Sequence, residues 1–195
     1  MKHLRALSVL SLALALCACN TTTPVSMQYD ASAITAPKGN PVVAVSTVTS
    51  KREKSDPYAL GAILGGFGNP LQTITSEVPV TDVVKTLVTD GLKARNLASP
   101  NPKYNMTIDI LRLDCSQLVR REAHVDLAVT VQNASTQEVV FNKGARSDKT
   151  NGSVITMETG ILASTDDLRA IMNEALQEAV NNLLDDPQFR AAIQN

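Results

Sequence analysis

An apolar stripe near the C-terminus constrains the fold more than any other feature of the sequence. Between Leu168 and Leu184, apolar residues recur every three or four positions without a miss. This spacing predicts one face of an amphipathic helix. Ser164 or Thr165 can cap the start of that helix, and Asp186-Pro187 ends it. A helix with a single apolar stripe must pack that stripe against another layer, so the chain needs a sheet or a second helix.

Strands in the middle of the chain supply that layer. Residues 121–133 alternate strictly between apolar and polar, which is typical of a strand with one face on the core and one face towards water. Residues 103–114 also predict a strand, but their alternation changes phase near Ile110. The phase change indicates either two partly covered faces or a β-bulge. Residues 138–146 read as the return strand of a hairpin.

The remaining elements complete an α+β domain over residues 41–195. Residues 41–50 and 71–77 predict strands, and residues 79–95 predict a second amphipathic helix with Pro79 at its first turn. The expected order is strand, strand, helix, strand, strand, strand, helix. We therefore predict a single antiparallel-rich sheet with the two amphipathic helices packed on one face.

The N-terminus has the pattern of a lipoprotein signal peptide. Lys2 and Arg5 precede an uncharged run of 11 residues, which is too short to span a bilayer. The sequence Leu16-Cys17-Ala18-Cys19 then reads as a lipobox. Cleavage before Cys19 places small Ala18 at the cleavage site, whereas cleavage before Cys17 would place bulky Leu16 there. We predict a signal peptide over residues 1–18 and lipid attachment, with palmitate as one acyl chain, at Cys19.

The residues after the cysteine are expected to hold the domain near a membrane. Residues 19–40 are rich in Thr, Ala, Ser and Pro without a clear period, so we predict a lipidated flexible tether of roughly 25 Å. Asn20 favours the outer membrane, because an Asp at that position favours retention in the inner membrane of enteric bacteria. We expect a periplasm-facing protein of the bacterial outer membrane, with the inner membrane as the alternative.

Composition argues against several classes of function. Without Lys2 and Arg5, 16 basic residues stand against 19 acidic ones, so no basic excess points to nucleic acid. Tryptophan is absent and Phe and Tyr are few, which predicts an aliphatic core and few stacking platforms. After processing, Cys115 is the only thiol left, so no intramolecular disulfide can form.

Candidate catalytic residues have simpler explanations. His124 is the only histidine outside the leader and lies on the polar face of a predicted strand, without a second ligand for a metal. Cys115 has no evident base nearby in the sequence. The pairs Asp166-Asp167 and Asp185-Asp186 are explained by helix capping and helix termination. We expect no catalytic residue, no metal and no cofactor, and we predict that the protein is not an enzyme.

The uncharged glycine-rich segment over residues 58–70 is the one local oddity. It lacks the Gly-Lys-Ser/Thr ending of a phosphate loop. One interpretation is a long ordered loop whose Ile63, Leu64 and Phe67 pack on the domain. The other is a loop that contacts a partner or a membrane, because uncharged apolar loops are often interaction sites. The candidate contact residues are Leu64, Gly65, Gly66, Phe67, Gly68 and Asn69.

Taken together, the lipobox, the Thr/Pro-rich segment, residues 61–70 leading into Leu71, the helix over 79–95 and the strand opened by Arg121-Glu122-Ala123 resemble the YajG-like family of bacterial lipoproteins. The resemblance implies a lipid-anchored α+β domain with no catalytic residues. We expect a binding or structural role in envelope assembly or maintenance, with an envelope protein as partner. The alternative is an auxiliary lipoprotein of an ABC-type lipid or solute transport system.

Overall fold

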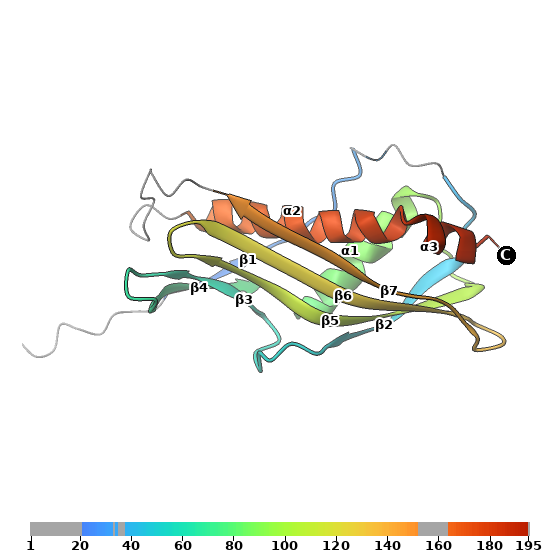
Figure 1. Cartoon of the computed structure of the whole chain (residues 1–195), viewed down its shortest axis with the longest axis horizontal. Helices are drawn as coiled ribbons and strands as arrows, with labels where there is room; N and C mark the ends of the chain where they lie inside the picture. Colours follow the sequence, from blue (N-terminus) through green and yellow to red (C-terminus); the bar gives the residue numbers. More distant parts are fainter. Residues whose placement is uncertain (1–20, 33, 35–37, 152–163, 195) are drawn as a thin grey trace, which may run out of the picture.

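A computed structural model describes residues 21–32, 34, 38–151 and 164–194. Within these residues, seven strands form one sheet and three helices accompany it (Figure 1). In chain order the elements are β1 (Thr21–Val25), β2 (Val43–Ser50), β3 (Ala59–Leu64), β4 (Pro70–Ser76), α1 (Val80–Ala94), β5 (Tyr104–Gln117), β6 (Arg121–Asn133), β7 (Val139–Asn151), α2 (Thr165–Leu184) and α3 (Pro187–Ala192).

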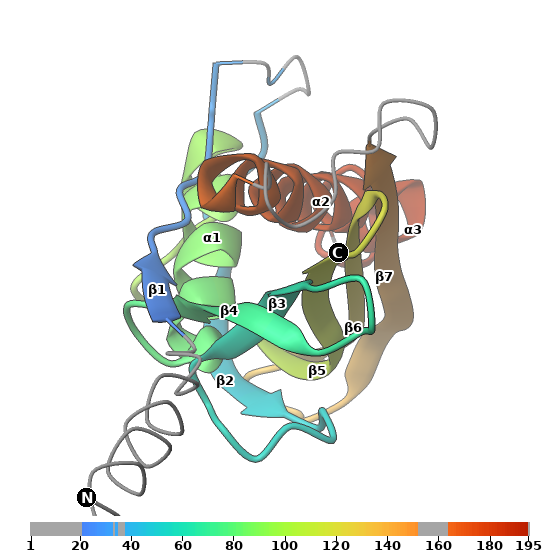
Figure 2. The same ribbon diagram turned by 90° about the vertical axis from the view of Figure 1, so that its left-hand side faces the viewer.

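The predicted fold class is confirmed. The helices α1 and α2 lie on one face of a single open sheet, and their apolar stripes meet its buried face (Figures 1 and 2). The three long strands pair antiparallel, β5 with β6 and β6 with β7. Ser164 caps α2 as expected, because its Oγ accepts a hydrogen bond from the Asp167 backbone N–H. The described core is mostly aliphatic, and its aromatic residues are Tyr104 and an edge-to-face pair of Phe141 and Phe189.

The phase change in β5 is a bulge. The register of β5 against β6 shifts between Ile110 and Arg112. The extra residue, Leu111, is 47% exposed, whereas Ile110 and Leu113 on either side of it are fully buried. The bulge thus returns the following apolar residues to the core face.

The outer edge of β5 is shared between two strands. Its first half pairs in parallel with β2 as far as Ile110, and its end pairs in parallel with β3 from Cys115 onwards. Neither strand pairs with residues 111–114, where the bulge lies. β4 and then β1 extend the sheet beyond β3.

The prediction of a flexible tether over residues 19–40 was wrong for residues 21–25. Thr21–Val25 is β1, a parallel edge strand hydrogen-bonded to β4. Val25 is buried, and the Tyr29 hydroxyl donates a hydrogen bond to Asn181 Oδ1 of α2 at 2.7 Å. No alternating pattern predicts this strand from the sequence. It is only five residues long, and hydrogen bonds to the neighbouring strand β4 hold it in place.

The predicted long loop over residues 58–70 is instead most of a β-hairpin. Ala59–Leu64 forms β3, which pairs antiparallel with β4 across a turn at residues 65–69. In that turn the Gly65 N–H donates to the Asn69 carbonyl at 2.8 Å, and Gly68 has the positive φ of 79° that favours glycine. The expected order therefore lacked β1, β3 and the short helix α3.

Candidate functional site

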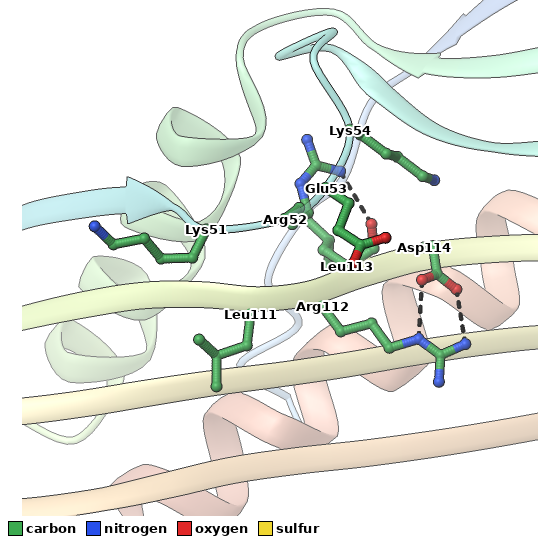
Figure 3. A pocket seen from close by; sticks show the side chains of 8 residues that line it. All are labelled: Lys51, Arg52, Glu53, Lys54, Leu111, Arg112, Leu113 and Asp114. Carbon is green, nitrogen blue, oxygen red and sulfur yellow. Dashed lines mark hydrogen bonds and ion pairs between the residues drawn. The ribbon is translucent and has the colours of Figure 1, made fainter.

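The interruption in the pairing of β5 opens a hollow of about 410 Å³, which we call the strand gap (Figure 3). One wall is the segment that leaves β2, and the other is the bulged part of β5. Four cationic and two anionic side chains gather there. The lining residues are Lys51, Arg52, Glu53, Lys54, Leu111, Arg112, Leu113 and Asp114.

Arg52 bridges the interrupted strands. Its Nη1 donates to the Ala59 carbonyl of β3 at 2.6 Å and to the Leu113 carbonyl of β5 at 3.0 Å. Lys54 reaches the same region, because its Nζ donates to the Leu60 carbonyl at 2.9 Å. These two side chains hydrogen-bond backbone carbonyls beside the interruption and so connect strands that do not pair there.

The positive charge of the strand gap is incompletely compensated. Burial lowers the pKa of the Arg52 guanidinium and of the Lys54 ammonium, and the opposing attraction of Asp114 is the smaller effect on both. Asp114 also accepts hydrogen bonds from Arg112 at 2.9 and 3.3 Å. Arg52 Nη2 is buried and has no hydrogen-bond partner in the described part of the chain. An anionic group bound here would meet a donor that is already desolvated.

His124 and Cys115, the side chains considered for acid–base or nucleophilic chemistry, are not among the residues that line this hollow. His124 Nδ1 is 2.6 Å from Asp148 Oδ1, across the β6–β7 pair, and this contact lowers the pKa of the Asp148 carboxyl. Cys115 is buried on β5, and burial raises the pKa of its thiol to about 12. A thiol with such a pKa stays protonated and is a poor nucleophile near neutral pH.

Sequence comparison places the chain in a family. Residues 39–194 match a family described as uncharacterized lipoproteins. The match spans the domain from just before β2 to the end of α3. This chain belongs to that lipoprotein family. It is therefore a membrane-anchored protein of the cell envelope. A search of curated proteins found no match to the lipoprotein.

Solved structures share its fold. Protein XCC0632 from Xanthomonas campestris, of family DUF330, has a TM-score of 0.63 at 16% identity, and the alignment covers 88% of this chain and 96% of that one. An uncharacterized protein has a TM-score of 0.52 at 5% identity, covering 84% and 95%. Protein CT253 from Chlamydia trachomatis reaches 0.49 at 12% identity, covering 80% and 100%. At these identities the first two similarities support the fold alone.

The predicted contact residues of the lipoprotein lie at one end of the sheet. Leu64 ends β3, and the other five form the turn before β4. The packing interpretation is right for Ile63, which is 2% exposed, and wrong for Phe67, which is fully exposed. The predicted lipid site at Cys19 lies outside the described residues. Within those residues no helix is both long and apolar enough to cross a membrane.

The other predicted residues have structural roles in the lipoprotein. Arg121 pairs with Asp167 at 2.9 Å, which ties β6 to the start of α2. Asp186 caps α3 by accepting from the Gln188 N–H at 2.7 Å. Asp185 does more than end a helix, because it forms an ion pair with buried Arg95. In the described part of the chain no group of three potential metal ligands comes together.

The strand gap was not predicted from the sequence. Residues 51–54, with the sequence Lys-Arg-Glu-Lys, read as a charged loop, and the bulge near Ile110 was one of two open interpretations. Two signals pointed to the site: a net positive run directly after one strand, and a bulge in another. The sequence does not reveal the parallel pairing of β2 with β5, which brings residues 51–54 next to the bulge.

Proposed function

We propose that this lipoprotein is a non-catalytic binding protein of the bacterial envelope, anchored by lipid at Cys19 and acting in envelope assembly or maintenance. Its partner is an envelope protein that places an acidic group in the strand gap. The resemblance of its lipobox and strand pattern to the YajG-like lipoproteins supports this role, and Asn20 favours the outer membrane.

One observation carries the proposal: four cationic side chains line the strand gap against two anionic ones, and Arg52 Nη2 is a buried donor without a hydrogen-bond partner in the described part of the chain. Arg52 and Lys54 are held in place by backbone carbonyls, so neither must be reorganised when a ligand arrives. A carboxylate that pairs with Arg52 Nη2 would satisfy the unpartnered donor. Hydrogen bonds to charged groups contribute about 1.5–3 kcal/mol, enough for a specific contact.

The anchor is tested by replacing Cys19 with alanine. The native protein should sediment with membranes and resist extraction by high salt, because several acyl chains attach a protein stably. The Cys19→Ala variant should move to the soluble fraction, as judged by fractionation and immunoblotting. A Cys17→Ala variant is the matched control and should stay in membranes. Release by Cys17→Ala with retention of Cys19→Ala would reverse the assignment.

The binding role is tested by photocrosslinking in cells. A photoreactive residue at Lys51 should capture a specific envelope protein, whereas one at Thr86, on the exposed face of α1, should not. Adding Lys54→Gln should reduce the Lys51 adduct about tenfold, because one charge-assisted hydrogen bond is lost. Equal capture from Lys51 and Thr86, or capture unaffected by Lys54→Gln, would reject the strand gap as the binding site.

A further inference from the structure

The hairpin tips of β3–β4 and β5–β6 lie at the same end of the sheet. β3 and β5 run parallel, and Ile63 near the end of β3 is in register with Gln117 at the end of β5. The turn at residues 65–69 and the turn at residues 118–120 are therefore neighbours. Figure 2 looks at this end of the molecule and shows both turns extending towards the viewer. We call these two turns, together with Leu71, the apolar end.

The apolar end concentrates exposed hydrophobic side chains. Of the eight large hydrophobic residues exposed in the described part of the chain, four lie here: Phe67, Leu71, Leu118 and Val119. Phe67 is 102% exposed, so the described part of the chain leaves its ring open to solvent. An aromatic side chain placed in this way, with aliphatic neighbours, needs a partner surface to cover it.

The charges of the apolar end are of one sign. The segments 64–72 and 117–121 contain no Asp or Glu, while the second contains Arg120 and Arg121. Arg121 pairs with Asp167, and Arg120 is exposed. Apolar tips with an adjacent exposed arginine match the interface of an anionic bilayer, where hydrophobic side chains enter the headgroup boundary and basic residues meet lipid phosphates.

The position of the start of β1 indicates that the bilayer covers this surface. Thr21 is in register with Gln72, which follows Leu71, so β1 begins at the apolar end. Cys19 precedes Thr21 by two residues, and two residues span at most about 7 Å. A lipid on Cys19 would therefore enter the bilayer close to the start of β1 at the apolar end, and not at the end of a long flexible tether.

We propose that the apolar end rests on the bilayer that holds the lipid, so that the domain has a fixed orientation on the membrane. This inference depends on the proposed lipid at Cys19. The long strands then extend away from the surface, and the far end of the β6–β7 hairpin, with exposed Val139, points away from the membrane. The lipid and the two hairpin tips together form three points of contact.

The test uses the full-length lipidated protein in vesicles of phosphatidylethanolamine and phosphatidylglycerol. A polarity-sensitive fluorophore is attached through Gly66→Cys, where a side chain meets open space, and separately through Val139→Cys as the matched control. The label at position 66 should shift to the blue and be quenched by lipids carrying a shallow quencher, because interfacial elements enter roughly 5–10 Å. The label at position 139 should show neither effect.

A second comparison isolates the side chains. Adding Phe67→Ser and Leu118→Ser to Gly66→Cys should abolish most of the quenching while the protein still floats with the vesicles. Flotation without quenching at position 66 in the parent protein would overturn the docked orientation but leave the anchor intact. Failure to float would instead reject the anchor. In cells, capture of a protein from a photoreactive residue at position 67 would show that a protein, not lipid, covers the apolar end.

Discussion

Replacing Gly61 with alanine should lower the free energy of unfolding by about 3 kcal/mol or more, at the upper end of the cost of overpacking. A Cβ at Gly61 would lie 1.7 Å from the carbonyl oxygen of Cys115 and 2.6 Å from its carbonyl carbon. Those atoms belong to the backbone of β5, so no side-chain rotation can relieve the overlap. The expected result is separation of β3 from β5, with loss of the pairing that borders the strand gap.

Thermal unfolding followed by circular dichroism measures this effect. For a domain of this size the melting temperature should fall by roughly 10 °C, since each kcal/mol corresponds to about 2–4 °C. Gly66→Ala is the matched control, because its Cβ would meet no atom within 4 Å, and its melting temperature should be unchanged. Equal stability of the two variants would show that β3 does not approach β5 as closely as the structure places it.

Replacing Asp185 with asparagine should destabilise the fold by about 2–3 kcal/mol, because breaking a buried ion pair costs about 3–5 kcal/mol and Asp185 is itself partly solvated. Arg95 is buried, and its guanidinium donates to both Asp185 carboxylate oxygens at 2.7 and 2.6 Å. It also donates to the Tyr29 hydroxyl at 2.6 Å. Asparagine keeps the shape of Asp185 but leaves the arginine charge without its counter-ion.

Denaturant unfolding at several pH values separates this effect from a change of shape. The hydrogen bonds from Arg95 hold the pKa of Asp185 below its ordinary value of 3.8. The stabilisation is therefore complete above that value and disappears as the pH falls through the lowered pKa. The difference between native protein and Asp185→Asn should be constant near neutral pH and shrink in acid below about pH 4. A constant difference down to strongly acidic pH would contradict the ion-pair explanation.

Asp90→Asn provides the control for a surface ion pair. Asp90 accepts from Lys93 at 2.9 Å in the neighbouring turn of α1, and both side chains are exposed. Exposed pairs contribute at most about 1 kcal/mol, so this variant should be close to the native protein in stability. The contrast between the two aspartates measures how much the burial of Arg95 matters.

Elements with strong local periodicity were predictable from the sequence. The stripe of α2 and the alternation of β6 are each set by residues close together in the chain, and both elements formed within a few residues of the expected bounds. The bulge in β5 was visible for the same reason, since it breaks the alternation within one strand.

Elements that depend on distant pairing were not predictable. β1 has no alternation and exists because β4 offers it a parallel edge, and β3 was hidden by Gly61, which reads as a loop residue until its close approach to β5 is known. Arg95 reads as an ordinary basic residue at a helix end, although it is buried and organises a partly buried network with Tyr29 and Asp185. The strand gap likewise needs two segments about 60 residues apart.

The direction of β1 has a mechanical consequence. With the proposed anchor at Cys19, a pull on the lipid acts on the first residue of β1 and along the axis of the strand. β1 is parallel to β4 over Thr21–Val25, so such a force loads their hydrogen bonds in shear, all at once. A force across the strand would instead open them one after another, at lower load. The pairing of β1 with β4 would thus resist a pull on the proposed anchor through all of its hydrogen bonds together.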